Sequence, residues 1–156
     1  MLELDIETIH KALINKEVTS DELVKEALKK SHEVQRSCNA FVTILDDQKG
    51  GEVTDSLLSG IPYGLKDNYS TKGILSTGSS NTLKDYVPFF SATSVLNLEK
   101  SGAVLVNKTA MDEFGMGGTG TTCHTGIVKN PWDHTRMTAG SSAGSAAAVA
   151  SGVYPY

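Results

Sequence analysis

The hydrophobic pattern of the first 37 residues predicts two amphipathic helices. The first follows Asp5, a candidate N-cap. Its apolar positions lie on one helical face: Ile6, Ile9 and Leu13. The second begins at a capping box formed by Thr19 and Glu22. Its apolar stripe comprises Leu23, Val24, Ala27, Leu28 and Val34. Because neither helix is stable alone, we expect residues 1–37 to form an antiparallel hairpin packed against the rest of the chain.

The pattern then changes to short apolar segments typical of strands. Phe41–Leu45 is β-branched and apolar, and Ile61–Leu65 is a second short apolar segment. Ser94–Lys100 has helical spacing, and Ala103–Val106 follows it as a buried strand. This strand–helix–strand order favours an α/β architecture with some parallel pairing. We therefore expect residues 38–156 to form the start of an α/β core.

Composition places the chain among globular proteins and excludes several functions. Hydrophobic residues make up 39% and charged residues 21%, and no apolar run approaches the roughly 20 residues needed to cross a bilayer. The N-terminus is acidic and lacks the layout of a signal peptide, so we expect a cytoplasmic protein without a membrane partner.

Charge is unevenly distributed along the chain. The net charge is −4, and residues 1–60 hold 7 Lys/Arg against 12 Asp/Glu, whereas residues 61–156 hold 7 against 6. The absence of a basic stripe excludes direct nucleic-acid binding by this segment. The acidic half is either a solvated helical face or a docking surface for a basic partner.

The cysteines and histidines do not predict a metal site or a disulfide framework. Cys38 and Cys123 form no CxxC pair, so they are expected to be free thiols. The histidines lack zinc-ligand spacing: His10, His32, His124 and His134. We therefore predict neither a metal nor a resident cofactor in this chain.

A glycine–threonine loop spans residues 115–126. It lacks the Gly-Lys-Ser/Thr of a phosphate-binding P-loop. It fits GxGxxG only loosely, and it follows Met111–Phe114, which has a helical pattern instead of the strand that a dinucleotide site needs. We expect either the floor of an active site, with Gly117 binding substrate through bare backbone, or a structural loop.

Lys66 and the serines at 141 and 142 are the candidate catalytic residues. Lys66 follows the strand Ile61–Leu65, where burial would favour a neutral amine that can act as a base. Small residues flank Ser141 and Ser142, so a substrate or a lysine can approach their hydroxyls closely. The turn does not match GxSxG, and an ordinary turn or helix caps remain alternatives. The combination predicts a serine–lysine hydrolytic site, with Ser142 as a candidate substrate-binding residue.

Four phrases in the chain resemble the amidase signature family: Gly60–Asn68, Lys108–Gly117, Lys129–Asp133 and Ala139–Ala150. The phrase Met111–Gly117 is similar to that of a tRNA-dependent subgroup, the A subunits of glutamyl-tRNA(Gln)/aspartyl-tRNA(Asn) amidotransferases. The resemblance implies a mixed sheet wrapped by helices, of which this chain would hold only the N-terminal part.

The resemblance also implies catalytic roles. In the family the unit is Ser–cis-Ser–Lys, in which Lys66 matches the base and Ser141 matches the bridging serine, whose preceding peptide bond is cis. The whole protein would release ammonia from glutamine to convert Glu-tRNA(Gln) or Asp-tRNA(Asn) to the amidated form. A B subunit would bind the aminoacyl-tRNA and use ATP and Mg, and a C subunit would stabilise the resulting heterotrimer.

The chain departs from the family pattern in two respects. Ala139 and Ala143 replace glycines of Gly-Gly-Ser-Ser-Gly-Gly, and alanine prefers negative φ. The family's nucleophile and oxyanion hole lie in Asp-x-Gly-Gly-Ser, roughly two dozen residues past Ser141 and therefore beyond Tyr156. We expect the fragment to be inactive alone and, because of open sheet edges, marginally soluble or associated. The alternatives are a stand-alone small-amide amidase and a truncated, non-catalytic binding module.

Overall fold

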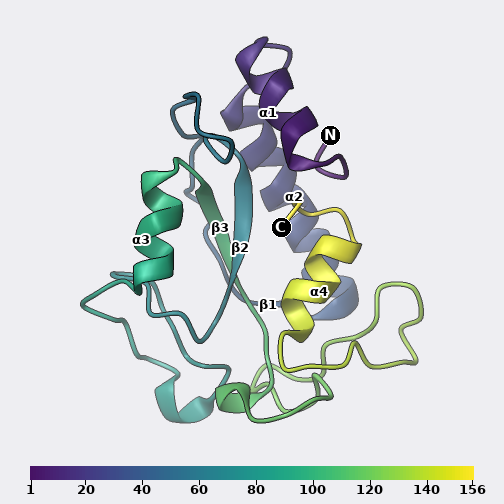
Figure 1. Ribbon diagram of the computed structural model, residues 1–156. Coiled ribbons are helices and arrows are strands. Elements are labelled where there is room, and N and C mark those ends of the chain that lie inside the picture. The colour runs from purple at the N-terminus through teal and green to yellow at the C-terminus, as the bar shows by residue number, and fades with distance from the viewer.

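The computed structural model describes residues 1–156 as a mixed three-stranded sheet with helices on both faces. The elements in chain order are α1 (Ile6–Ile14), α2 (Ser20–Cys38), β1 (Phe41–Ile44), β2 (Pro62–Lys66), η1 (Asn81–Leu83), α3 (Thr93–Lys100), β3 (Val104–Thr109), η2 (Glu113–Gly115) and α4 (Ala143–Ala150). Figure 1 shows α3 on one side of the sheet and α2 and α4 on the other. The α/β class is confirmed.

The two N-terminal helices begin where their capping residues predict. Asp5 Oδ1 accepts a hydrogen bond from the Thr8 amide at 2.9 Å. Thr19 and Glu22 form both halves of the capping box at the start of α2. Apolar side chains of both helices belong to the same core cluster as residues of the strands. The division into a hairpin (1–37) and a core (38–156) stays a prediction.

The sheet has the strand order β1-β3-β2 and contains both kinds of pairing. β2 and β3 are parallel and are joined through α3, as the strand–helix–strand pattern predicts. β1 pairs with β3 in the antiparallel direction. β3 extends three residues beyond the predicted end at Val106, through Asn107, Lys108 and Thr109, which are polar but fully buried.

A β-bulge in β3 changes which residues face α4. The pairing with β2 passes from Tyr63–Leu105 to Gly64–Asn107, so Val106 has no partner on β2. A single extra residue turns the following side chains to the opposite face. Asn107 thereby faces Tyr154, whose hydroxyl donates a hydrogen bond to Asn107 Oδ1 at 3.0 Å.

Two apolar cores lie on opposite faces of the sheet. The smaller one, on the α3 side, comprises Tyr63, Leu65, Val95 and Leu105. The larger one joins α1, α2 and α4 to the other face, and its strand residues include Phe41, Val104 and Val106. Three small residues of α4 are buried in this larger core: Ala143, Ala147 and Ala148. Their short side chains allow α4 to pack closely against the sheet.

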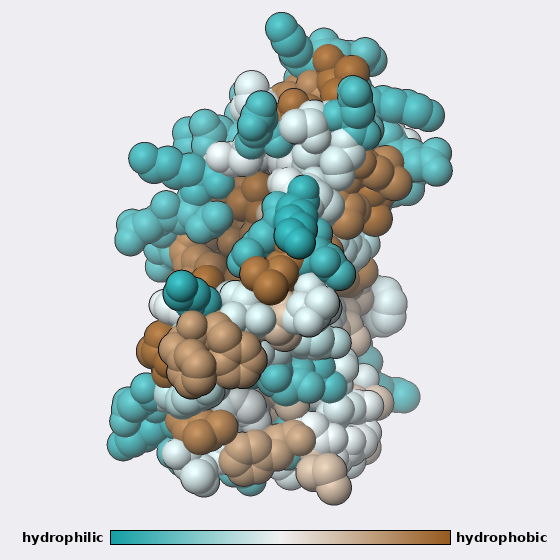
Figure 2. Space-filling view, turned by 60° about the vertical axis from the view of Figure 1, so that its left-hand side comes forward, coloured by the Kyte–Doolittle hydropathy of each residue, from teal (hydrophilic) through white to brown (hydrophobic).

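The surface retains several exposed apolar side chains. Phe89 is 82% and Met116 84% exposed, and Figure 2 shows hydrophobic side chains in separate clusters on one face. β1 and β2 form the two edges of the sheet. The marginal solubility of the isolated chain stays a prediction. No helix is both long and apolar enough to cross a membrane.

Replacing Gly64 by alanine is expected to destabilise the fold. The new Cβ would lie 1.8 Å from the Tyr154 hydroxyl and 2.7 Å from Asn107 Oδ1, so the free energy of unfolding should fall by about 1–3 kcal/mol or more. Urea denaturation measures the change. Gly118→Ala is the matched control, because its Cβ would meet no atom within 4 Å. Equal stabilities of the two variants would contradict the close contact between β2 and Tyr154.

Candidate active site

The structure brings together Lys66 and Ser141, which lie 75 residues apart in the sequence. Lys66 is the last residue of β2, and Ser141 lies just before α4. Lys66 Nζ donates a hydrogen bond to Ser141 Oγ at 2.8 Å. The Gly140–Ser141 peptide bond is cis, as the family resemblance implies. The geometry of the predicted pair is therefore present, whereas the two catalytic roles stay predictions.

The loop that carries Ser141 and Ser142 is adapted to small residues. Ala139 has φ 64°, a left-handed conformation that favours glycine. Ser142 occupies the N-cap position of α4, but its side chain makes no capping hydrogen bond. The exposed hydroxyl of Ser142 is therefore free to contact a ligand. Its role in substrate binding stays a prediction.

A pair of hydrogen-bonded hydroxyls lies on the same face of the sheet as Lys66. Thr109 is paired with Lys66 across the two strands, and paired residues point to the same face of a sheet. The hydroxyls of Thr109 and Ser145 are 2.7 Å apart. Because Ser145 belongs to α4, this hydrogen bond fixes the first turns of the helix against the end of β3.

A buried ion pair lies at the ends of β2 and β3, on the other face of the sheet. Lys108 Nζ lies 3.6 Å from Asp67 Oδ1, and both side chains are fully buried. Burial lowers the pKa of Lys108, and the nearby carboxylate of Asp67 opposes that shift. Asp67 Oδ2 also accepts hydrogen bonds from Thr77 and from the Ser79 amide. The pair therefore fixes the loop that follows Lys66.

The glycine–threonine loop is organised by Asp112, which is not one of the predicted site residues. The buried carboxylate accepts five hydrogen bonds, from the backbone amides of residues 119–122 and the Thr122 hydroxyl. Burial alone would raise the pKa of Asp112, but the hydrogen bonds from Gly120 and Thr122 hold it below its ordinary value of 3.8. The loop is mostly exposed, including Gly117.

The helical expectation for Met111–Phe114 is wrong. The chain forms only a short 3₁₀ turn, Glu113–Gly115, in which Phe114 has φ 53°. The physical reason is that the left-handed conformation of Phe114 cannot continue a right-handed helix. The Asp112 amide donates to the carbonyl of Ser141 at 3.0 Å. This segment therefore joins β3 to the serine loop.

The cysteines are free and buried, as expected. Cys123 Sγ lies 3.1 Å from the Thr125 hydroxyl, and Cys38 Sγ lies 3.7 Å from His134 Nε2. No three or more His, Cys, Asp or Glu side chains are grouped so that they could hold a metal ion.

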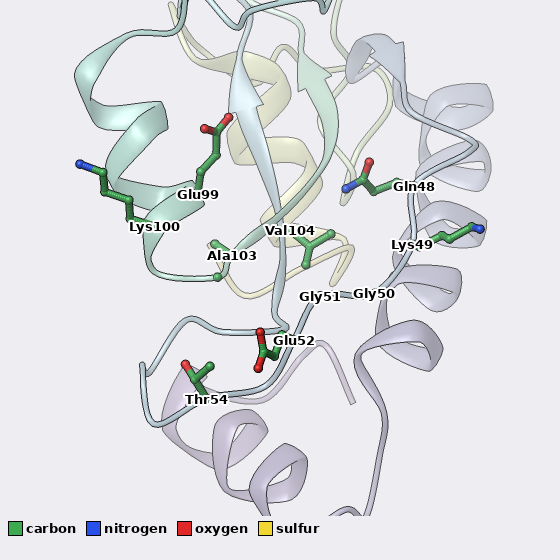
Figure 3. Close-up of a pocket in the computed structure, with 11 residues that line it drawn as sticks. Gln48, Lys49, Gly50, Gly51, Glu52, Thr54, Glu99, Lys100, Ala103 and Val104 are labelled. Atoms are coloured by element: carbon green, nitrogen blue, oxygen red, sulfur yellow. The ribbon is translucent and has the colours of Figure 1, made fainter.

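A separate pocket lies away from the Lys66–Ser141 pair. Figure 3 shows it between the segment around Gly50 and Gly51 and the turn from α3 to β3. Its lining is mostly polar and contains neither Lys66 nor Ser141. This pocket therefore adds nothing to the candidate active site.

Comparison with known proteins identifies the protein family to which this fold and the Lys66–Ser141 pair belong. The Amidase family model matches residues 22–156. The chain belongs to the amidase family.

Two relatives show which members of the family this chain is similar to. The chain is similar to the A subunit of the glutamyl-tRNA(Gln) amidotransferase of Streptococcus pneumoniae (strain Hungary19A-6), with 46% identity over 94% of this chain and 32% of the relative. The crystal structure of the corresponding protein of Thermotoga maritima superposes with a TM-score of 0.87 at 32% identity, covering 97% of this chain and 32% of that chain.

A hydrolase of different specificity also shares the fold. The structure of 6-aminohexanoate cyclic dimer hydrolase complexed with substrate has a TM-score of 0.87 and 28% identity, covering 99% of this chain and 33% of that chain. The chain thus spans about a third of the length of the relatives that it matches.

Opposite effects are expected when the two alanines of the serine loop are replaced by glycine. Ala139→Gly removes the left-handed strain of an alanine and should raise the free energy of unfolding by up to about 1 kcal/mol. Ala143→Gly is the matched control, because it removes a buried methyl group at the start of α4 and should lower stability by about 1 kcal/mol. Urea denaturation of both variants measures the effects, and destabilisation by Ala139→Gly would contradict the observed loop conformation.

Proposed function

We propose that this chain is the N-terminal part of the glutaminase subunit of a tRNA-dependent amidotransferase. The observation that carries the proposal is the 2.8 Å hydrogen bond between Lys66 and Ser141 in a fold of the amidase family. The 46% identity to the A subunit of an amidotransferase favours this reaction within the family.

The proposed chemistry is acyl transfer through a second serine. Lys66, when unprotonated, would accept a proton through the Ser141 hydroxyl as that second serine attacks the side-chain amide carbon of glutamine. The C–N bond then breaks, and the proton returns from Lys66 through Ser141 to the departing ammonia. Water cleaves the glutamyl ester in the same way. Gly117 and Ser142 are proposed to bind the substrate.

The ammonia would be used elsewhere in a heterotrimer. A B subunit would bind Glu-tRNA(Gln) or Asp-tRNA(Asn) and would use ATP and Mg to activate the acyl group for amidation. A C subunit would stabilise the pair. This chain itself would hold no cofactor and would not contact the tRNA directly, consistent with its net charge of −4.

A stand-alone amidase acting on small amides is the principal alternative. It is favoured by the fold shared with 6-aminohexanoate cyclic dimer hydrolase. Affinity purification from the native host distinguishes the two: an amidotransferase subunit brings two partner subunits, whereas a simple amidase brings none. A non-catalytic binding module is the other alternative, and for that protein Lys66→Ala would leave the biological role intact.

The 156-residue chain alone is expected to release no ammonia from glutamine. The Lys66–Ser141 pair supplies a base and a bridge, whereas the family's nucleophile and oxyanion hole belong to a phrase that these 156 residues do not contain. A coupled assay for ammonia checks this. If the chain released ammonia and the Ser141→Ala variant did not, the expectation would be wrong and the nucleophile would lie within these residues.

Sequencing of the encoding DNA past the codon for Tyr156 complements that assay. An in-frame Asp-x-Gly-Gly-Ser, roughly two dozen residues after Ser141, would supply the nucleophile and support the proposal. A stop codon directly after Tyr156 would contradict it and favour the binding module.

A further inference from the structure

One carboxylate touches two segments of the candidate active site, the glycine–threonine loop and the serine loop. Asp112 accepts hydrogen bonds from the amides of residues 119–122 and lies against the backbones of Gly117 and Gly140. A Cβ on Gly117 would lie 2.7 Å from Asp112 Cγ, and one on Gly140 would lie 2.0 Å from Asp112 Oδ2. The two glycines therefore leave the space that the carboxylate fills.

Asp112 also contacts the Gly140–Ser141 unit through its own backbone. The Asp112 amide donates a hydrogen bond to the Ser141 carbonyl at 3.0 Å, while its carboxylate lies against the α-carbon of Gly140. Residue 112 thus restrains the serine loop from two directions. In this position, the Ser141 hydroxyl accepts the hydrogen bond from Lys66 Nζ.

The five donors around Asp112 fill the whole acceptor capacity of an ionised carboxylate. Two of them bind Oδ2 and three bind Oδ1, and an ionised carboxylate offers about four lone-pair positions. An amide side chain would turn an NH₂ group toward some of these N–H donors. A buried donor without an acceptor is costly, so the loop would have to move.

We propose that Asp112 is a positioning residue of the candidate active site, whose buried carboxylate joins the glycine–threonine loop to the Gly140–Ser141 unit and so keeps the Ser141 hydroxyl within hydrogen-bonding distance of Lys66. Asp112 does not touch the reacting atoms. Its significance for catalysis rests on the proposed function, whereas its effect on the contact between Lys66 and Ser141 is independent of turnover.

The test is the rate at which Lys66 is acetylated in the folded 156-residue chain. Limiting acetic anhydride is added, and acetylation of each lysine is quantified by mass spectrometry. Exposed Lys72 is the internal reference, and fully buried Lys108 reports opening of the whole fold. Asp112→Asn should raise the ratio of Lys66 to Lys72 acetylation severalfold while Lys108 stays protected, because Lys66 loses the fixed position of its acceptor.

A second variant and two controls separate positioning from general destabilisation. Gly117→Ala leaves the carboxylate in place but presses a methyl group against it, so it should also raise the ratio. Glu113→Gln removes the neighbouring, exposed acid, and Gly118→Ala adds a methyl group in open space. Both controls should leave the ratio unchanged.

The outcomes decide the proposal whether or not the chain is a glutaminase. An unchanged ratio of Lys66 to Lys72 in Asp112→Asn and Gly117→Ala would overturn it. If acetylation of Lys66 and of Lys108 rose in parallel in both variants, that would also overturn the proposal, since Asp112 would then support the fold as a whole. Loss of glutaminase activity is not measured, so failure here leaves the proposed function standing.

Discussion

The bulge at Val106 determines which side chains reach each face of the sheet. Before it, Leu105 faces the α3 side; after it, Asn107 and Thr109 face α2 and α4, and Lys108 faces the α3 side. Without the extra residue, these assignments would be reversed by the period-two alternation of a strand. β-Bulges commonly occur beside active sites, where they redirect a side chain.

The parallel ends of β2 and β3 then separate two kinds of chemistry. Toward α4 lie Lys66 and Thr109, which contact the hydroxyls of Ser141 and Ser145. On the other face, the buried pair of Lys108 and Asp67 holds the chain that leaves β2, together with the loop amides that bind the carboxylate. Binding sites of α/β folds are typically found at the carboxyl ends of parallel strands. The candidate site fits that rule because each strand contributes its last residue.

Much of this fold could be predicted from local patterns in the sequence. Apolar periodicity predicts α1, α2 and α3, capping residues predict where α1 and α2 begin, and short apolar segments predict the strands. The polar end of β3, residues 107–109, could not be predicted, because it is buried only through partners distant in sequence. Asp112 gives no signal either, since most of its partners are backbone amides, which every sequence contains. The residue pattern around Lys66 and the two serines predicts a serine–lysine site, and the family resemblance identifies Ser141 as the serine that pairs with Lys66.

The proposed passage of a proton through Lys66 and Ser141 during glutamine hydrolysis is open to direct measurement. The experiment compares Lys66→Ala and Ser141→Ala with the unmodified protein, at the length of its relatives and assembled with its partner subunits. Glutamine-dependent amidation of the tRNA should fall by roughly 10²–10⁴-fold in both variants, whereas amidation with added ammonia should continue, because it bypasses the hydrolysis. Retention of glutamine-dependent amidation in either variant would contradict the proposed proton transfer.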